Sequence, residues 1–150
     1  MKHKMKHKRI FIFALILFVA GLMGYTISQH TMKTNLQTEK SNIVKNYVAT
    51  ISVYNEIFNE AKGVIASSDE EFEKFSKLNE KVNTVNLDNF DSVYDLQIEL
   101  FSEFFTFVQA NKNIIFNEKS SKEYLFDDFR KRKDYFFIVS NSYQEMLKDA

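Results

Sequence analysis

The part of the chain after residue 28 contains no proline and a single glycine, Gly63. Tight turns in hairpins and barrels depend on these two residue types, because glycine tolerates positive φ angles and proline presets the backbone of a turn. A chain without them reverses direction mainly by ending one helix and beginning the next. We therefore predict an all-α fold, in which residues 29–150 form an antiparallel bundle of three to four long helices.

The first 28 residues have a different composition. Residues 10–27, IFIFALILFVAGLMGYTI, contain no charged side chain, and the uncharged stretch continues through Gln29. About 18 apolar residues are close to the minimum with which a helix crosses a bilayer. We predict a transmembrane helix over residues 10–28, so that the lipid bilayer is the first partner of the chain. The side chains expected to meet the membrane include Ile10, Phe11, Leu15, Leu17, Phe18, Leu22 and Tyr25.

Positive charge precedes the apolar run without any acidic residue, in the form of Lys2, Lys4, Lys6, Lys8 and Arg9. Segments rich in Lys and Arg stay on the cytoplasmic side of a membrane. Residues 1–9 are thus expected to be a cytoplasmic tail and residues 29–150 an extracytoplasmic domain, held in the plasma membrane by a single-pass anchor. The alternative is a cleaved signal peptide, but the small residues near the end of the run, Gly24, Thr26 and Ser28, fit a cleavage site poorly.

The formal net charge of zero results from two unlike regions. The chain has 20 basic and 20 acidic residues, and five of the bases precede residue 10, so that residues 10–150 carry 15 basic and 20 acidic groups. A mildly acidic domain argues against nucleic acid as a partner, because phosphate binding requires a basic surface. The run 130–133, RKRK, is a local exception. Asp127 and Asp128 precede it at the spacing of ion pairs along a helix, so we expect a solvated helix face there.

The spacing of apolar residues predicts the helices of the bundle. Steps of three and four residues indicate a long helix over residues 33–66, which can run on from the membrane span through a fraying segment at 29–42. A capping box opens a second helix that ends near 86–89, a third runs from about 91 to 110, and another capping box opens the last. The apolar row of the first helix is Val44, Tyr47, Ile51, Tyr54, Phe58, Ala61 and Ile65, and that of the second is Phe72, Phe75, Leu78, Val82 and Val85. The two capping boxes are Ser68 with Glu71 and Ser120 with Glu123, and Ile114 to Phe116 form an apolar plug in the loop before the last helix. The core residues of the last helix are Leu125, Phe129, Phe136, Val139, Tyr143 and Met146.

The third predicted helix is the most apolar of the bundle. Two adjacent stripes cover more than half of its circumference, which is typical either of the most buried helix or of a helix with a face for a partner. Leu100, Phe104 and Phe107 are the candidate partner face, for another protein or for a second copy of the chain. The stripes are Tyr94, Ile98, Phe101, Phe105 and Val108, and Val93, Leu96, Leu100, Phe104 and Phe107; the remaining strip, Asp91, Asp95, Glu99 and Glu103, is expected to be solvated.

Several kinds of chemistry have no residues to support them. The only histidines are His3, His7 and His30, and the chain has no cysteine. The bundle therefore has no imidazole or thiolate for a nucleophile and its base, and no His or Cys ligands for zinc or iron. Carboxylate metal sites in four-helix bundles also use a Glu-x-x-His motif, which does not occur here. We expect no catalytic residue, cofactor or metal, and an envelope hydrolase is the disfavoured alternative.

One stretch carries a resemblance to a known family. Residues 42–54, NIVKNYVATISVY, are similar to the segment that opens the long helix of LemA family proteins, with Asn46, Val48 and Thr50 in matching positions. Leu125, Phe129 and Tyr143 also fall at the spacing of that family's later positions, whereas Lys45 stands where the family has proline. The resemblance implies an antiparallel helical bundle displayed at the membrane and implies no active site.

Together these features favour a non-enzymatic interaction or scaffold protein of the bacterial cell envelope, whose bundle binds another protein or a second copy. The alternative is an extracytoplasmic ligand-sensing bundle that resembles the sensor domain of a chemoreceptor. Such a sensor would use a second span and a cytoplasmic output domain, and neither is present in these residues, so this alternative requires that the chain is a fragment or has a transducing partner. Pilin-like assembly is a further option, but the processing signature, a glycine followed by an acid before the apolar run, is missing.

Overall fold

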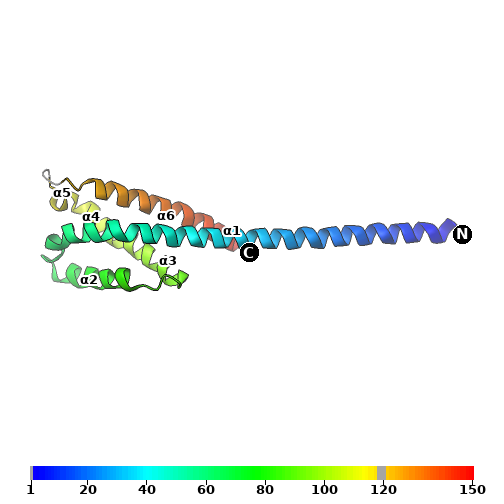
Figure 1. Ribbon diagram of the computed structural model, residues 1–150, viewed down its shortest axis with the longest axis horizontal. Coiled ribbons are helices and arrows are strands. Elements are labelled where there is room, and N and C mark those ends of the chain that lie inside the picture. Colours follow the sequence, from blue (N-terminus) through cyan, green and yellow to red (C-terminus); the bar gives the residue numbers. More distant parts are fainter. Residues whose placement is uncertain (1, 118–120) are drawn as a thin grey trace.

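The computed structural model describes residues 2–117 and 121–150, with side chains from residue 13 onward. All the elements in these two ranges are helical, which confirms the predicted all-α fold (Figure 1). In chain order they are α1 (Lys2–Ile65), α2 (Asp69–Thr84), α3 (Phe90–Glu99), the π-helical turn η1 (Leu100–Phe104), α4 (Phe105–Ala110), α5 (Lys112–Ile115) and α6 (Tyr124–Lys148).

Helix α1 dominates the molecule. Its 64 residues form one helix, about 95 Å long at 1.5 Å per residue. The N-terminal half projects alone from the bundle, and the C-terminal half runs through it as the central helix (Figure 1). The fraying predicted at 29–42 was wrong, because the helix continues through this polar segment without a break. Nothing in its sequence removes a backbone hydrogen-bond donor, since the chain has no proline.

The other helices pack around the C-terminal half of α1. Helix α2 returns alongside it, α3 to α4 cross between α2 and α6, and α6 runs antiparallel to α1 with the most extensive contact (Figure 1). The start of α2 agrees with the predicted cap, because the Ser68 hydroxyl accepts a hydrogen bond from the Glu71 backbone N–H at 3.5 Å. Helix α3 begins at Phe90, about one residue earlier than predicted, and is capped by Asn89, whose side chain accepts from the Ser92 N–H at 3.1 Å.

The face of α1 that enters the core is wider than the predicted row. Tyr47, Tyr54, Ala61 and Ile65 are buried as expected, whereas the other members of that row are half-buried. A second row is buried and was not predicted. It consists of Ile43, Asn46, Thr50, Val53 and Ile57. The reason is that α6, α3 and α2 all pack on α1, so two neighbouring rows are covered instead of one.

The third predicted helix is interrupted by the π-helical turn η1, which the apolar spacing did not predict. A π-turn inserts one extra residue into the helix and shifts the side chains that follow to a new face. Here the ring of Phe101 packs 5.4 Å from that of Phe129 on α6, while the ring of Phe104 packs 5.5 Å from that of Phe75 on α2. The shift lets the two apolar stripes meet helices on opposite sides, so both stripes contribute to the core.

The described residues that precede position 118 pack partly into the core. Ile115 and Phe116 are buried as the predicted plug, although they end a short helix, α5, rather than lie in a loop, and Ile114 is exposed. The predicted cap residue Ser120 lies outside the described residues. Helix α6 then buries five of its six predicted core residues, and Met146 is half-buried near the C-terminus.

Candidate membrane anchor and interaction surfaces

Residues 13–27 of the apolar segment, whose side chains are described, are exposed along their whole length. Among the residues with described side chains, α1 is the one helix that is both long enough and apolar enough to cross a membrane. None of the residues in its most apolar 18-residue stretch is buried. Leu17 is 70% exposed and Tyr25 is 66% exposed, and Leu15, Phe18 and Leu22 are exposed as well. The predicted anchor residues Ile10 and Phe11 lie outside the residues with described side chains. This exposure fits a membrane anchor or a signal sequence.

Residues 29–45, called the stalk below, join the apolar segment to the bundle core. One side of the stalk is partly covered, where Leu36 packs against the core and Lys40 lies 4.8 Å above the ring of Phe90. The hydroxyls of Thr34 and Thr38 donate to the backbone carbonyls of His30 and Thr34 one turn earlier, at 3.0 and 2.9 Å. Because both hydroxyls find their acceptors within α1, these polar side chains need no partner from another helix.

The predicted partner face does not reach the surface. Leu100 and Phe104 have no exposed area, and Phe107 is only 7% exposed. The ring of Phe104 contacts Tyr54 at 4.9 Å and Phe75 at 5.5 Å between centroids, and Phe107 contacts Phe75 at 4.9 Å. Leu100, Phe104 and Phe107 therefore serve the internal packing of α1, α2 and α4, because α2 covers the face that a partner would have used.

The acidic strip of the third helix lies at the surface as expected, and two of its members also form ion pairs with α2. Glu99 forms an ion pair with Lys81 at 3.1 Å, and Glu103 forms one with Lys74. The side chains of all four residues remain more than a third exposed. Ion pairs this exposed contribute roughly 0–1 kcal/mol each, so they orient α2 more than they stabilise it.

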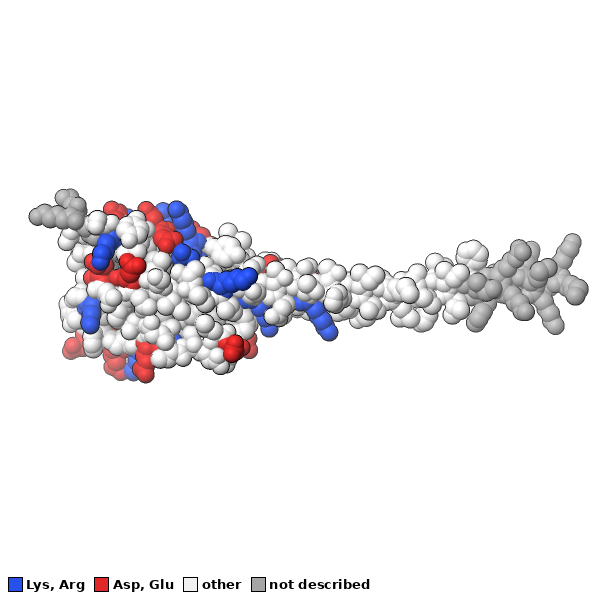
Figure 2. Space-filling view, in the orientation of Figure 1, with Lys and Arg blue, Asp and Glu red and all other residues white. Residues whose placement is uncertain are grey.

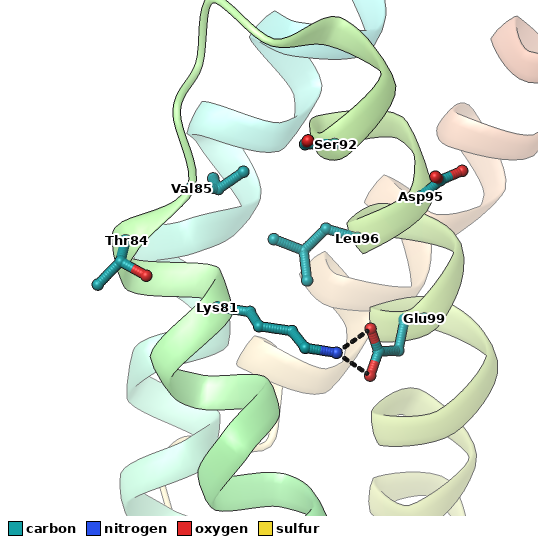
Figure 3. Close-up of a pocket in the computed structure, with 7 residues that line it drawn as sticks. All are labelled: Lys81, Thr84, Val85, Ser92, Asp95, Leu96 and Glu99. Atoms are coloured by element: carbon teal, nitrogen blue, oxygen red, sulfur yellow. Dashed lines mark hydrogen bonds and ion pairs between the residues drawn. The ribbon is translucent and has the colours of Figure 1, made fainter.

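A groove of about 390 Å³ lies between the C-terminal end of α2 and the start of α3. Figure 3 shows Lys81 reaching across its lower end to both carboxylate oxygens of Glu99, with Leu96 pointing toward the space between them. Asp95 points away from the lysine. The remaining residues along the groove are Thr84, Val85 and Ser92. Lys81 and Glu99 thus neutralise each other, and Asp95 is the one other charged residue, among those described, that lines the groove.

The basic run at 130–133 is also largely paired. Arg130 contacts Asp127 at 3.0 Å, and Arg132 contacts Asp128 at 3.4 Å, which agrees with the predicted helix ion pairs except that Asp127 pairs with Arg130 instead of Lys131. Lys133 lies near Asp134 and 4.8 Å above the ring of Phe105. The run therefore does not present a free basic patch.

Sequence reasoning missed a buried polar network at the centre of the bundle. The Nδ2 of Asn46 donates to Gln97 Oε1 on α3 at 3.3 Å and to the Arg132 carbonyl oxygen on α6 at 3.2 Å. Gln97 Nε2 donates back to the Ile43 carbonyl oxygen at 3.1 Å, and the Thr50 hydroxyl donates to the Asn46 carbonyl oxygen at 2.7 Å. A signal was present, because Gln97 falls inside the apolar arc of its helix and Asn46 lines up with Thr50.

Two buried tyrosines join α1 to α2. The hydroxyl of Tyr47 donates to the Val82 carbonyl oxygen at 2.6 Å, and that of Tyr54 donates to Asn79 Oδ1 at 3.3 Å. Burial raises the pKa of both hydroxyls above its ordinary value, and for Tyr54 the nearby Tyr47 adds to the increase. A higher pKa keeps each phenol protonated, so these groups act as structural donors and not as bases.

Chemistry-bearing residues are not gathered elsewhere on the described part of the chain. No cluster of three or more His, Cys, Asp or Glu side chains is placed to hold a metal ion within the described residues. Single apolar side chains are exposed on α1 and α6, among them Val48 at 50% and Ile138 at 68%. Single exposed apolar side chains are normal on folded proteins and do not by themselves mark an interaction surface.

Comparison with known proteins finds no matching protein-family model, no matching curated protein and no matching solved structure. The resemblance at residues 42–54 therefore rests only on the residues that match in sequence. Two of the three matching positions, Asn46 and Thr50, belong to the buried network, and the third, Val48, is exposed. In this fold Asn46 joins α1 to α3 and α6, whereas the Thr50 hydroxyl donates within α1.

Proposed function

We propose that the chain is a single-pass membrane protein whose helical bundle lies outside the cytoplasm and acts as a non-enzymatic interaction or scaffold protein of the bacterial cell envelope, LemA-like in character. The observation that carries the proposal is the exposed apolar segment of α1, which continues as one helix into the core. Exposing such an apolar segment to water costs free energy, and a lipid bilayer removes that cost. The basic residues before it favour a cytoplasmic N-terminus.

The interior of the bundle supports a structural role. Its buried polar side chains are Asn46, Thr50, Gln97 and Ser140, and each makes a hydrogen bond within the protein. None of these side chains is an ionisable group set beside a nucleophile, which is the arrangement that acid–base catalysis uses. In the described bundle, residues 46–117 and 121–150, the exposed surfaces of the helices are thus the features through which we expect the protein to act.

Topology is tested by labelling single cysteines, because the natural chain has none. Asn59→Cys places a thiol on an exposed position of the bundle, and Lys6→Cys places one on the tail. In intact cells a membrane-impermeant maleimide should label Asn59→Cys, and it should label Lys6→Cys only after lysis. The reverse pattern would put the bundle in the cytoplasm, and release of the chain by alkaline carbonate would contradict the anchor.

Interaction is tested by a photo-crosslinking residue placed at exposed Ile138, with the same residue at buried Phe104 as the matched control. We expect a discrete adduct heavier than the chain from position 138 and none from position 104. Two differently tagged copies in one cell then separate self-association from binding to another protein. A chain that remains monomeric with the crosslinker at Val48, Tyr135 and Ile138 in turn would argue against an interaction protein.

Ligand sensing with a transducing partner is the second candidate. Its supporting observation is that α1 connects the tail and the bundle without a break, which is the connection that a signal across the membrane would need. The groove between α2 and α3 is where a small ligand would bind. If candidate ligands raise the melting temperature of the full chain and Leu96→Trp removes that effect, sensing is favoured; a melting temperature unaffected by any ligand argues against it.

A further inference from the structure

The lysines of the stalk differ from most bases of the bundle. Within the described residues, nine bases of the bundle lie within ion-pair distance of a carboxylate: Lys74, Lys77, Lys81, Lys112, Lys122, Arg130, Arg132, Lys133 and Lys148. In the same part of the chain, neither Lys33 nor Lys45 of the stalk has a carboxylate partner, and Lys40 packs on the ring of Phe90. The stalk therefore presents unneutralised positive charge.

Charge is also segregated along the molecule. The stalk carries Lys33, Lys40 and Lys45 against the single acid Glu39, a net charge of +2. Residues 46–150 hold 12 basic and 19 acidic residues, a net charge of −7. Figure 2 shows red and blue atoms mixed over the bundle and mainly blue atoms on the stalk. The positive charge thus lies next to the apolar segment, and the negative charge lies beyond it.

The unbroken helix sets how far each lysine lies from the end of the apolar run. At 1.5 Å per residue, Lys33 is about 9 Å beyond Ile27 and Lys45 about 27 Å beyond it. The headgroup layer on one side of a bilayer is roughly 5–8 Å thick, and charges are screened over about 8 Å at physiological salt. Lys33 can therefore reach headgroup phosphates with its long side chain, whereas Lys45 is too distant to do so.

The surroundings of Lys33 are suited to an anion. Lys33 lies on a hollowed face of α1 that no described acidic side chain lines. The other residues along this face are His30, Thr34, Gln37, Thr38, Ser41, Asn42 and, at its far end, Lys45. Lysine binds phosphate as a point charge and needs no fixed geometry, so a single exposed helix is sufficient support for it. A bilayer that contains anionic lipid is the nearest source of phosphate to this position.

We propose that Lys33 binds the headgroup phosphates of anionic phospholipid in the bilayer that α1 crosses. The inference rests on the proposed anchor but not on its orientation, because the end of the apolar run meets a headgroup layer in either case. The ligand that we propose is the phosphate of the lipid headgroup, not a free phosphate ion.

The test uses the full chain in bilayers of phosphatidylcholine and phosphatidylglycerol, with a photoreactive group on the headgroup of one lipid or the other. Adducts are mapped by mass spectrometry to the stalk and to the basic tail, and the tail serves as an internal reference. One lysine near an anionic surface is expected to favour the phosphatidylglycerol probe at the stalk by about five-fold. Lys33→Gln should remove that preference, Lys33→Arg should keep it, and the matched variant Lys45→Gln should keep it.

Equal labelling of the stalk by the two probes in the natural chain would overturn the proposal. So would a preference that survives in Lys33→Gln, or one that Lys45→Gln removes to the same extent. Free inorganic phosphate at millimolar concentration should not compete; if it abolishes the preference, the site is not a lipid site. Failure of the proposed anchor is separately recognised, because the chain would then be released from cell membranes by alkaline carbonate whatever the reconstituted protein does.

Discussion

Asn46 of α1 donates a hydrogen bond from Nδ2 to the backbone carbonyl oxygen of Arg132 in α6, at 3.2 Å and across 86 residues of sequence. The same amide group lies 3.3 Å from Gln97 Oε1 on α3. One buried side chain thus joins the central helix to two of the helices that pack on it. A buried amide without its partners loses its hydration and gains nothing in return, so the network is satisfied only when the three helices are in register.

Replacing Asn46 should therefore destabilise the bundle. Asn46→Ala leaves Gln97 Oε1 buried without a donor, and we expect a loss of about 1–3 kcal/mol in the free energy of unfolding. The measurement is urea unfolding of the full chain in detergent, followed by circular dichroism. Asn59→Ala, an exposed asparagine on the same helix, is the control and should change the free energy by less than about 0.5 kcal/mol. Equal effects from the two variants would show that the network adds no stability.

Phe104→Ala should be among the most damaging substitutions. The ring has no exposed area and contacts rings from α1, α2 and α6. Removing such a side chain costs about 3–5 kcal/mol, because the cavity is only partly refilled. Phe72→Ala on the exposed side of α2 should cost far less. If Phe104→Ala left the unfolding curve unchanged but abolished crosslinks to a partner, the predicted partner face would have to be restored.

The buried tyrosines predict a loss of stability at high pH. Burial raises the pKa of Tyr47 and Tyr54 in the folded protein above the ordinary value of 10.0. Above pH 10 the unfolded chain releases these protons while the folded chain keeps them, so deprotonation favours unfolding. The full stabilisation is present below pH 10 and declines as the pH rises above it.

Melting temperatures measured between neutral pH and pH 11 check this dependence. Tyr47→Phe should melt lower at neutral pH, because the hydrogen bond to the Val82 carbonyl is lost, but its melting temperature should fall less steeply above pH 10. Tyr124→Phe, at an exposed tyrosine, is the control and should follow the natural chain. Identical slopes for all three proteins would mean that the buried tyrosines do not govern alkaline unfolding.

Gly63→Ala should stabilise the bundle. Gly63 lies inside α1, and a Cβ atom placed on it meets nothing within 4 Å. Alanine restricts the unfolded chain more than glycine does, which is worth about 0.5–1 kcal/mol in a helix interior. The expected result is a higher urea midpoint with an unchanged slope. Ala49→Gly, at an exposed position of the same helix, should lower the midpoint by a similar amount. A lower midpoint for Gly63→Ala would indicate a contact on that face of α1.

Much of the secondary structure could be read from the sequence because it depends on local properties. The absence of proline from the chain and the single glycine after residue 28 leave helices as the main regular structure. Ser68 caps α2 as expected, since a hydroxyl three residues before a backbone N–H needs no tertiary contact. The row from Tyr47 to Ile65 and the apolar segment before it are likewise visible as spacing and as composition.

The tertiary structure decided which of the apolar and polar faces are covered. Leu100, Phe104 and Phe107 looked like a surface for a partner, but α2 covers them, and η1 turns the rest of their helix toward α6. Asn46 and Gln97 became core residues because two other helices supply their partners. Helix formation follows from neighbours a few residues apart, whereas burial depends on which distant segments come together, and the spacing of side chains along one helix does not specify its neighbours.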